Sequence, residues 1–248
     1  GIYFDWSKTH LDRELLERFV AVAESKQFTA ARDALFSGAI VNPTEGRSAE
    51  HVAERGTGAA DAVELAAARR TRMRALVDAV EAGAFGDVTG VLHIGIGGSV
   101  LGPAGLVDAL GRHSSRLNVR FLSNIDGEAF DDAVRTLDPA TTLIVTASKT
   151  FTAAETLANM NAGLDWLGAA GVDDPYGRVL AVTARPDAAL DAGIDETRIL
   201  QFSEGVGGRY SLWSAVGLSA AMALGWSAFE ELLEGAAEMD RHFRYAEP

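Results

Sequence analysis

Apolar residues in the first third of the chain recur at helical spacing. Between residues 11 and 36 they return every three or four positions, which is typical of amphipathic helices. Residues 59–82 form an alanine-rich, arginine-studded run without Gly or Pro, which favours one long helix. The segment Asn42-Pro43-Thr44-Glu45-Gly46 between them has the composition of a loop. Residues 1–85 are therefore predicted to be a helical amino-terminal segment.

The pattern changes at Val91 to short apolar runs separated by helical stretches. The expected strands are residues 91–96, 119–122, 143–146, 179–182 and 199–202. The expected helices are residues 104–110, 128–137, 153–167, 188–192, 211–224 and 228–243. Strands that alternate with helices indicate a parallel sheet covered on both faces. Residues 86–248 are thus predicted to be an α/β domain with a doubly wound parallel sheet of about five strands, and residues 83–90 mark its boundary.

Composition narrows the possible classes of function. The 248 residues contain no cysteine, which excludes disulfides, thiolate metal sites and cysteine nucleophiles. Their net charge of -13 disfavours nucleic-acid binding. No stretch reaches the roughly twenty apolar residues of a membrane span, and the first residues lack a signal pattern. We expect a soluble, cytoplasmic protein.

A glycine-rich turn, Gly97-Gly98-Ser99, follows the first expected strand. Glycines allow close backbone approach, and a helix amino terminus beyond them can cradle an anion. Such turns serve dinucleotides, phosphates and plain tight turns alike. No Gly-Lys-Ser/Thr follows, and Arg120 and Ser123 stand where a ribose-binding carboxylate would be expected, so a nucleotide site is disfavoured.

A second candidate site follows the third expected strand, where Ser148, Lys149, Thr150 and Thr152 gather at the next helix start. Hydroxyl and backbone N–H donors at a helix amino terminus suit a phosphate dianion. The alternative is an ordinary capped helix, with Thr150 or Thr152 as the cap and Glu155 closing a capping box. Taken alone, the cluster does not decide between them.

The expected fold brings these two turns together. In a doubly wound sheet of order 2-1-3-4-5, as in flavodoxin-like folds, the ends of strands one and three flank the point where ligands bind. We therefore expect Ser99, Ser148, Thr150 and Thr152 to converge on one anion.

A third element, Gly205 to Ser211, follows the fifth expected strand and contains Arg209. An arginine there can stabilise a developing oxyanion. Unlike a lysine, it cannot lose its own proton. The alternative is an arginine that forms an ion pair at a helix start.

Several ordered motifs resemble those of phosphoglucose isomerases. They are Ile94-Gly95-Ile96-Gly97-Gly98-Ser99-Val100-Leu101-Gly102-Pro103, Ser123-Asn124-Ile125-Asp126-Gly127, Ser148-Lys149-Thr150-Phe151-Thr152 and Val206-Gly207-Gly208-Arg209-Tyr210-Ser211-Leu212-Trp213-Ser214. Upstream, Phe4-Asp5-Trp6-Ser7-Lys8, Arg32-Asp33, Phe36-Ser37-Gly38 and Asn42-Pro43-Thr44-Glu45-Gly46-Arg47 are also similar to the family. The resemblance spans almost the whole chain and places its second part among the sugar-isomerase (SIS) domains.

The resemblance implies interconversion of glucose 6-phosphate and fructose 6-phosphate through an enediolate, without metal or organic cofactor. It implies that the phosphate is held by Ser148, Lys149, Thr150 and Thr152, and that Gly98 and Ser99 lie near the sugar. It also implies that Arg209 stabilises the enediolate and that Glu155 lies near the ring-opening histidine. The family is usually dimeric, with a histidine crossing between subunits, so we expect a homodimer of the full-length protein.

The chain departs from the family at two places. Ala153 and Ala154 stand where threonine and glutamine are common, and loss of one phosphate hydroxyl costs roughly 0.5 to 1.5 kcal/mol if nothing replaces it. The family's general-base glutamate, with a histidine and a lysine, comes from later segments, and none is found after Arg209. We expect phosphate binding with little or no turnover.

No histidine of this chain is expected to replace that base. His93 lies inside a strand and reads as a core histidine with satisfied hydrogen bonds. No carboxylate partner is visible for His10, His51 or His113, and His242 lies near the end of the last expected helix. Proton abstraction from C2 needs a base within hydrogen-bonding reach.

Two other functions stay open. One is a non-catalytic module that senses sugar phosphates, and the other is an isomerase that also accepts mannose 6-phosphate. The abrupt ends at Gly1 and Pro248 favour a shortened chain, and such a chain is expected to expose apolar surface that its missing half would cover.

Overall fold

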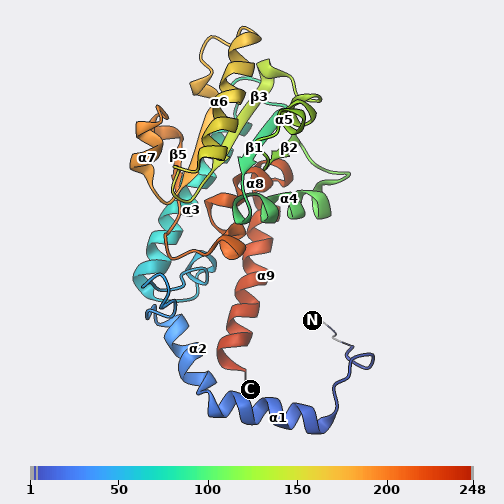
Figure 1. The fold of residues 1–248 in the computed structure, drawn as a ribbon, viewed down its shortest axis with the longest axis vertical. Coiled ribbons are helices and arrows are strands. Elements are labelled where there is room, and N and C mark those ends of the chain that lie inside the picture. The colour runs from blue at the N-terminus through green and yellow to red at the C-terminus, as the bar shows by residue number, and fades with distance from the viewer. Residues whose placement is uncertain (1–2, 4, 247–248) are drawn as a thin grey trace.

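A computed structural model describes residue 3 and residues 5–246 (Figure 1). The two chain ends that were expected to be abrupt, and Phe4 of the first family-like motif, lie outside the described residues. Three helices precede the sheet: α1 (Arg13–Ser25), α2 (Phe28–Phe36) and α3 (Ala60–Glu81). The expected long helix at 59–82 is confirmed within one residue at each end.

A single parallel sheet forms the centre of the second part. Its strands are β1 (Gly90–Gly95), β2 (Asn118–Leu122), β3 (Thr142–Ala147), β4 (Val179–Thr183) and β5 (Ile199–Gln201). The order is β2-β1-β3-β4-β5 and every pair is parallel, which confirms the predicted doubly wound α/β fold. Gly90 pairs with Thr142 and Gly95 with Ala147, so β1 and β3 end at the same level. The turns that follow them therefore leave the sheet side by side.

Helices connect the strands and close the chain. They are α4 (Gly98–Gly111), α5 (Gly127–Val134), α6 (Ala154–Ala169), α7 (Pro186–Asp191), α8 (Leu218–Leu224) and α9 (Trp226–Tyr245). The helix expected at 104–110 begins at Gly98, because the glycines and Pro103 that look like a loop in sequence are accommodated in its first turns.

The single helix expected over 211–224 is wrong. Two 3-10 turns, Gly208–Trp213 and Ala215–Gly217, occupy its first half. They are separated by Ser214, which has an extended backbone and whose hydroxyl accepts from Val216 N and donates to Ser211 O. A serine side chain that bonds nearby backbone groups competes with helical hydrogen bonds, so the α-helix starts only at Leu218.

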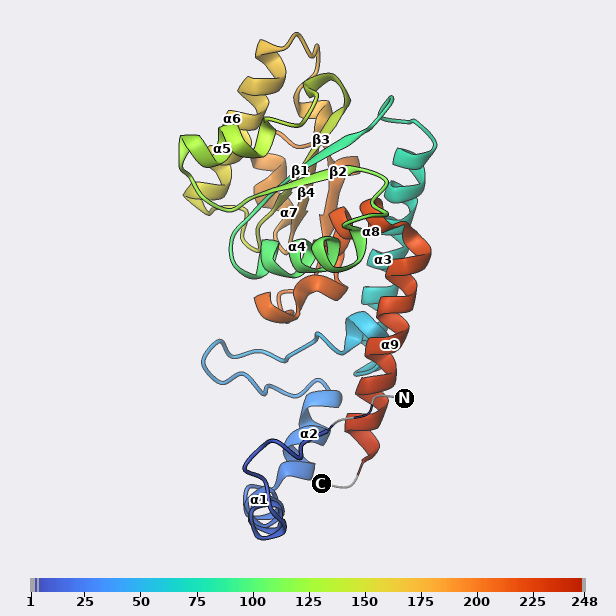
Figure 2. The same cartoon turned by 90° about the vertical axis from the view of Figure 1, so that its right-hand side faces the viewer.

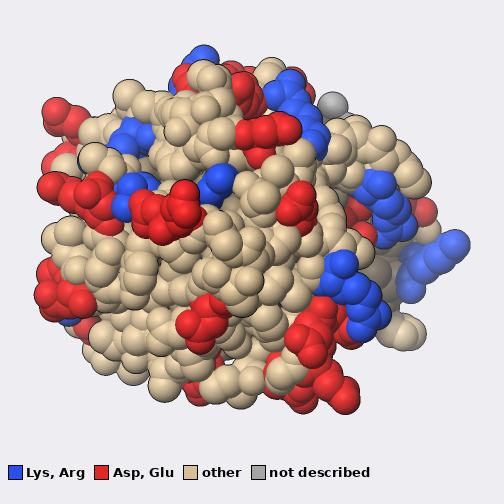
Figure 3. Space-filling view, turned by 90° about the horizontal axis from the view of Figure 1, so that it is seen from above, with Lys and Arg blue, Asp and Glu red and all other residues tan. Residues whose placement is uncertain are grey.

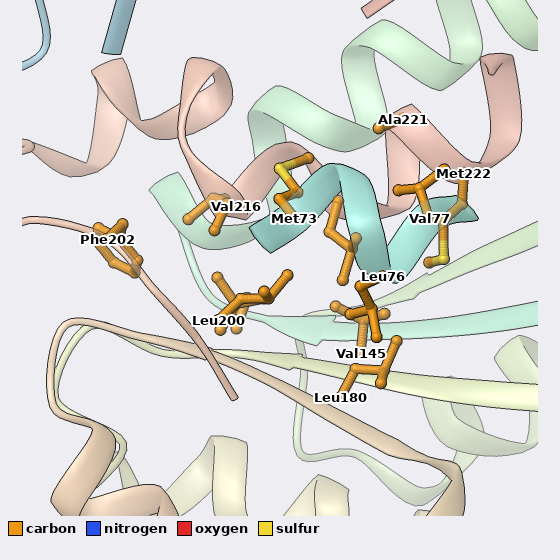
Figure 4. Packing of buried hydrophobic residues seen from close by; sticks show 14 of the residues in the cluster. Met73, Leu76, Val77, Val145, Leu180, Leu200, Phe202, Val216, Ala221 and Met222 are labelled. Atoms are coloured by element: carbon orange, nitrogen blue, oxygen red, sulfur yellow. The ribbon is translucent and has the colours of Figure 1, made fainter. Parts of the chain in front are cut away.

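The strands send alternate side chains into two apolar cores. Leu143 and Val145 of β3 face the core that α3, α8 and α9 cover, whereas Ile144 faces the core under α5, α6 and α7. Figure 4 shows the first core, in which Leu76 of α3 points toward Val145 of β3, while Val77 lies beside Met222 of α8. Because α3 shares this core with the sheet, this helix of the amino-terminal segment is packed into the α/β part. The division of the chain at residue 85 stays a prediction.

Helices α1 and α2 lie away from the sheet, near the end of α9 (Figure 2). Helix α1 buries none of its residues, while α2 is tied to α9 by Arg32 Nη1, which donates to the carbonyl of Phe243 over 3.1 Å. Carboxylates and cations are interspersed on the face drawn in Figure 3. None of the described helices combines the length and apolarity needed to cross a membrane.

Met73→Ala should lower the free energy of unfolding by about 2 to 5 kcal/mol, because it leaves a cavity in the core that α3 shares with the sheet, where Met73 is 2% exposed. Leu65→Ala on the same helix, at a side chain that is 55% exposed, should change it by less than about 0.5 kcal/mol. Urea unfolding followed by circular dichroism measures both. Equal effects of the two substitutions would show that α3 is not packed into the core.

Candidate functional site

Gly98 and Gly208 hold two loops against each other at the carboxyl end of the sheet. A β-carbon at position 98 would collide with the backbone of Gly208, so only glycine fits there. Ser211, which is 2% exposed, places its Oγ 3.1 Å from the carbonyl oxygen of Gly98 and 2.7 Å from that of Gly208. The loop after β5, which carries Arg209, is thereby fixed to the turn after β1.

A hydrogen bond from the buried His93 holds the turn after β1. Its Nε2 lies 2.7 Å from the carbonyl oxygen of Ser99, and its Nδ1 lies 2.7 Å from Ser219 Oγ on α8. A carbonyl only accepts, so Nε2 carries the proton and Nδ1 accepts from Ser219. Pro103 has no N–H to bond the Ser99 carbonyl within α4, which leaves that oxygen to the histidine. His93 is fully buried, and the prediction of a satisfied core histidine is confirmed.

The turn after β3 has a strained backbone of its own. Phe151 has φ 55, and its side chain is 2% exposed in the core under α6. Ser148 Oγ accepts from Phe151 N over 3.2 Å, which closes the turn. A left-handed conformation at a non-glycine residue costs about 1 to 2 kcal/mol, and burial of the phenyl ring offsets it. Such strain is concentrated at functional sites.

The amino end of α6 is not capped by a side chain. Its cap position is Ala153, and neither Thr150 nor Thr152 accepts from the first helical N–H groups. Their hydroxyls lie 2.9 Å from each other instead. The capping-box alternative is therefore wrong, and Glu155 lies exposed in the first turn of α6. The convergence of these hydroxyls with Ser99 on one anion stays a prediction.

Lys149 reaches from the turn after β3 to the loop after β5. Its Nζ donates to the carbonyl of Val206 over 3.2 Å. Burial lowers the pKa of this ammonium below its usual range, and the neighbouring cation of Arg47 lowers it further. The three turns after β1, β3 and β5 are thus joined to one another through Gly98, Gly208 and Lys149.

A cavity of about 540 Å³ opens beside this junction. Lys149 and Arg209 line it together with Arg47, His51 and Tyr210. The imidazole of His51 stacks on the phenol ring of Tyr210, with centroids 4.5 Å apart, and burial lowers the pKa of His51. The sequence offered no signal for Arg47 or His51 at this site beyond the family-like motif that contains Arg47.

Arg209 is exposed, and its Cζ lies 5.8 Å from the ring centroid of Tyr210. The ion pairs among residues 5–246 do not include it, so the ion-pair alternative is not observed there. No group of three or more His, Asp or Glu side chains within these residues is arranged to hold a metal ion. The guanidinium is thus available to a ligand beside the cavity.

Gly98→Ala should lower the free energy of unfolding by about 1 to 3 kcal/mol, because one of two backbones must move. Gly105→Ala is the matched control on α4, since a β-carbon there meets nothing within 4 Å. It should raise the free energy of unfolding by roughly 0.5 to 1 kcal/mol, as expected for alanine in place of helical glycine. Stabilisation by both substitutions in urea unfolding would contradict the close approach to Gly208.

Burial lowers the pKa of His93 from 6.5 to about 4. The unfolded chain therefore binds more protons below pH 6.5, and the stability contributed by the neutral ring is lost as the pH falls toward 4. Relative to His93→Gln, the native chain should lose roughly 2 kcal/mol between pH 6.5 and about 5. Burial raises the pKa of Glu54 to about 7, so this group makes the fold more stable as the pH falls. The difference in unfolding free energy between the native chain and His93→Gln at each pH cancels that effect, because both chains contain Glu54. A constant difference in unfolding free energy would show that His93 is not held neutral.

The chain matches known proteins over its full length. Residues 5–248 match the family described as phosphoglucose isomerase. The chain is 59% identical over 248 residues to a glucose-6-phosphate isomerase of Rhizorhabdus wittichii, covering 100% of this chain and 50% of that protein. It is 59% identical over 246 residues to one of Sphingopyxis alaskensis, covering 99% and 49%.

A solved structure has the same fold. The crystal structure of a glucose-6-phosphate isomerase from Chlamydia trachomatis superposes with a TM-score of 0.83 and 27% identity, over 95% of this chain and 47% of that one. The chain spans about half the length of the curated relatives that it matches. Since the family match over residues 5–248 and the shared fold agree, the chain belongs to the phosphoglucose isomerase family.

Proposed function

We propose that this chain is the sugar-phosphate-binding, amino-terminal part of a glucose-6-phosphate isomerase. The enzyme interconverts glucose 6-phosphate and fructose 6-phosphate in glycolysis and gluconeogenesis, and acts in the cytoplasm as a homodimer. The observation that carries the proposal is the junction of the three turns after β1, β3 and β5. In an open parallel sheet, ligands bind in the crevice outside the carboxyl ends of the strands.

The phosphate group binds at the turn after β3. Ser148, Thr150 and Thr152 supply hydroxyl donors, and the amino end of α6 supplies N–H groups that no side chain caps. Lys149 adds positive charge, although its Nζ also holds the Val206 carbonyl. A dianion is favoured there by the helix dipole as well as by direct hydrogen bonds.

The sugar lies toward Gly98 and Ser99, and its reacting carbons lie toward Arg209. In the proposed reaction the ring opens, a base removes the proton from C2, and the negative charge moves onto the enediolate oxygens. Arg209 stabilises that charge because a guanidinium stays protonated at any physiological pH. Glu155 orients the histidine that opens the ring, and that histidine belongs to a segment outside this chain.

The isolated chain does not complete this reaction. The proton at C2 requires a base within about 3 Å of it, and the proposal assigns that base to a glutamate outside these residues. Binding and turnover are therefore separable in this chain. The choice between glucose and mannose configurations is made partly by residues outside the chain, which also contact the sugar.

Titration calorimetry with fructose 6-phosphate, run beside a coupled isomerase assay on the same sample, tests the proposal. We expect heat of binding that saturates, together with no measurable formation of glucose 6-phosphate. Fructose without phosphate is the control ligand and should give no saturable heat. Turnover would show that a base lies within these residues, and absence of binding would refute the proposed site.

Ser148→Ala combined with Thr150→Ala should weaken fructose 6-phosphate binding by roughly 1 to 3 kcal/mol, because two hydroxyl donors to the phosphate are lost. Ser25→Ala combined with Thr71→Ala removes two hydroxyls from the exposed surface of α1 and α3 and serves as the matched control. Calorimetry on both double variants gives the comparison. Equal affinities would place the phosphate elsewhere.

A further inference from the structure

The loop that leads from β5 to Arg209 is anchored at four consecutive residues by groups outside it. Ser203 Oγ donates to the carboxylate of Glu50. The next three carbonyls accept in turn from Arg47 Nη1 over 2.8 Å at Glu204, from Glu50 N over 2.9 Å at Gly205, and from Lys149 Nζ over 3.2 Å at Val206. Three of these four anchors come from residues 42–50, which we term the strap.

Glu50 makes two of the three contacts between the strap and the loop. It holds the loop through both its backbone N–H and its carboxylate, which also accepts from Ser48 Oγ over 2.9 Å. A β-carbon at position 205 would lie 2.8 Å from Cδ and Cγ of Glu50, so the side chain is packed directly against the loop backbone. A side chain at position 205 would therefore displace the carboxylate of Glu50.

The strap holds Arg47 in place through its own short-range bonds. Asn42 and Arg47 exchange two backbone hydrogen bonds of 3.1 and 3.2 Å, which close the turn between them. Glu45 Oε2 lies 2.6 Å from Arg47 Nη2, and Asn42 Oδ1 accepts from Glu45 N over 3.2 Å. Arg47 therefore presents its Nη1 to the loop from a closed turn.

The loop needs such anchors because its glycine-rich sequence allows many backbone conformations. Gly205, Gly207 and Gly208 precede Arg209, and glycine loses more backbone entropy on ordering than any other residue. Arg209 is exposed and makes no ion pair within residues 5–246. Its position is therefore set through the backbone that leads to it.

We infer that the strap is a positioning element for Arg209, with Glu50 as its main positioning residue. The inference rests on the proposed function, in which Arg209 stabilises the enediolate. Removing the Glu50 carboxylate frees Ser203 and loosens the loop, so the guanidinium no longer lies where the enediolate charge develops. Preorganised donors act on developing charge only when they are already in place.

Glu50→Ala should accelerate amide hydrogen exchange of Gly205 and Val206, whose N–H groups donate to the Oγ and the carbonyl of Ser203, by about tenfold, since about 1.4 kcal/mol of local stability corresponds to that factor. Exchange in β1 and β3 should stay unchanged. Glu50→Gln keeps an oxygen acceptor for Ser203 and should restore slow exchange. Gly205→Ala places a β-carbon against the Glu50 side chain and should also accelerate exchange. Glu64→Ala, on the exposed face of α3, is the control and should leave exchange unchanged.

Ligand binding then tests whether the loosened loop misplaces Arg209. A phosphorylated hydroxamate that mimics the enediolate should bind Glu50→Ala about tenfold more weakly, whereas fructose 6-phosphate should bind within about twofold of the native chain. Glu50→Gln should restore hydroxamate affinity. Unchanged exchange, or faster exchange with unchanged hydroxamate affinity, would overturn the role of the strap. A native chain that binds neither ligand would refute the proposed function itself.

Discussion

The backbones of Gly98 and Gly208 meet without room for a β-carbon, and the arrangement of the site depends on this contact. Glycine at 98 lets the loop after β5 lie directly on the first turn of α4, where Ser211 Oγ lies close to both carbonyls. A larger residue would separate the loops and move Arg209 away from the end of β1. The general constraint is that two main chains can approach this closely only where at least one of them has no side chain.

That contact is supported by the core beneath it. His93 occupies a buried position in β1, and its ring joins the Ser99 carbonyl of α4 to the Ser219 hydroxyl of α8. A neutral imidazole suits this position because it donates through one nitrogen and accepts through the other, so no buried polar atom of the ring is left unpaired. Pro103 contributes by leaving the Ser99 carbonyl free of a helical bond. The turn after β1 is thereby fixed to the sheet and to α8 before any ligand arrives.

The regular elements could be predicted from the sequence because their signals are local. Apolar runs marked all five strands, and their alternation with helices indicated a parallel sheet. The observed order is the common doubly wound one that was assumed for it. The start of α4 was missed because Gly97, Gly98 and Pro103 are typical of loops, and the break at Ser214 was missed because it arises from side-chain bonds to nearby backbone. The strap could not be predicted at all, since Glu50 meets Ser203 and Gly205 across more than half of the chain and nothing in its neighbourhood marks it.

Titration of isotope-labelled chain with fructose 6-phosphate, followed by amide NMR, tests most directly whether the three turns form one site. We expect the amides of residues 97–99, 148–152 and 207–209 to shift together with a single dissociation constant, because they surround one ligand. Inorganic phosphate should shift residues 148–152 and leave Arg209 unchanged. Shifts confined to one turn, or different dissociation constants for the three turns, would show that the junction at Gly98 and Gly208 does not build a sugar-phosphate site.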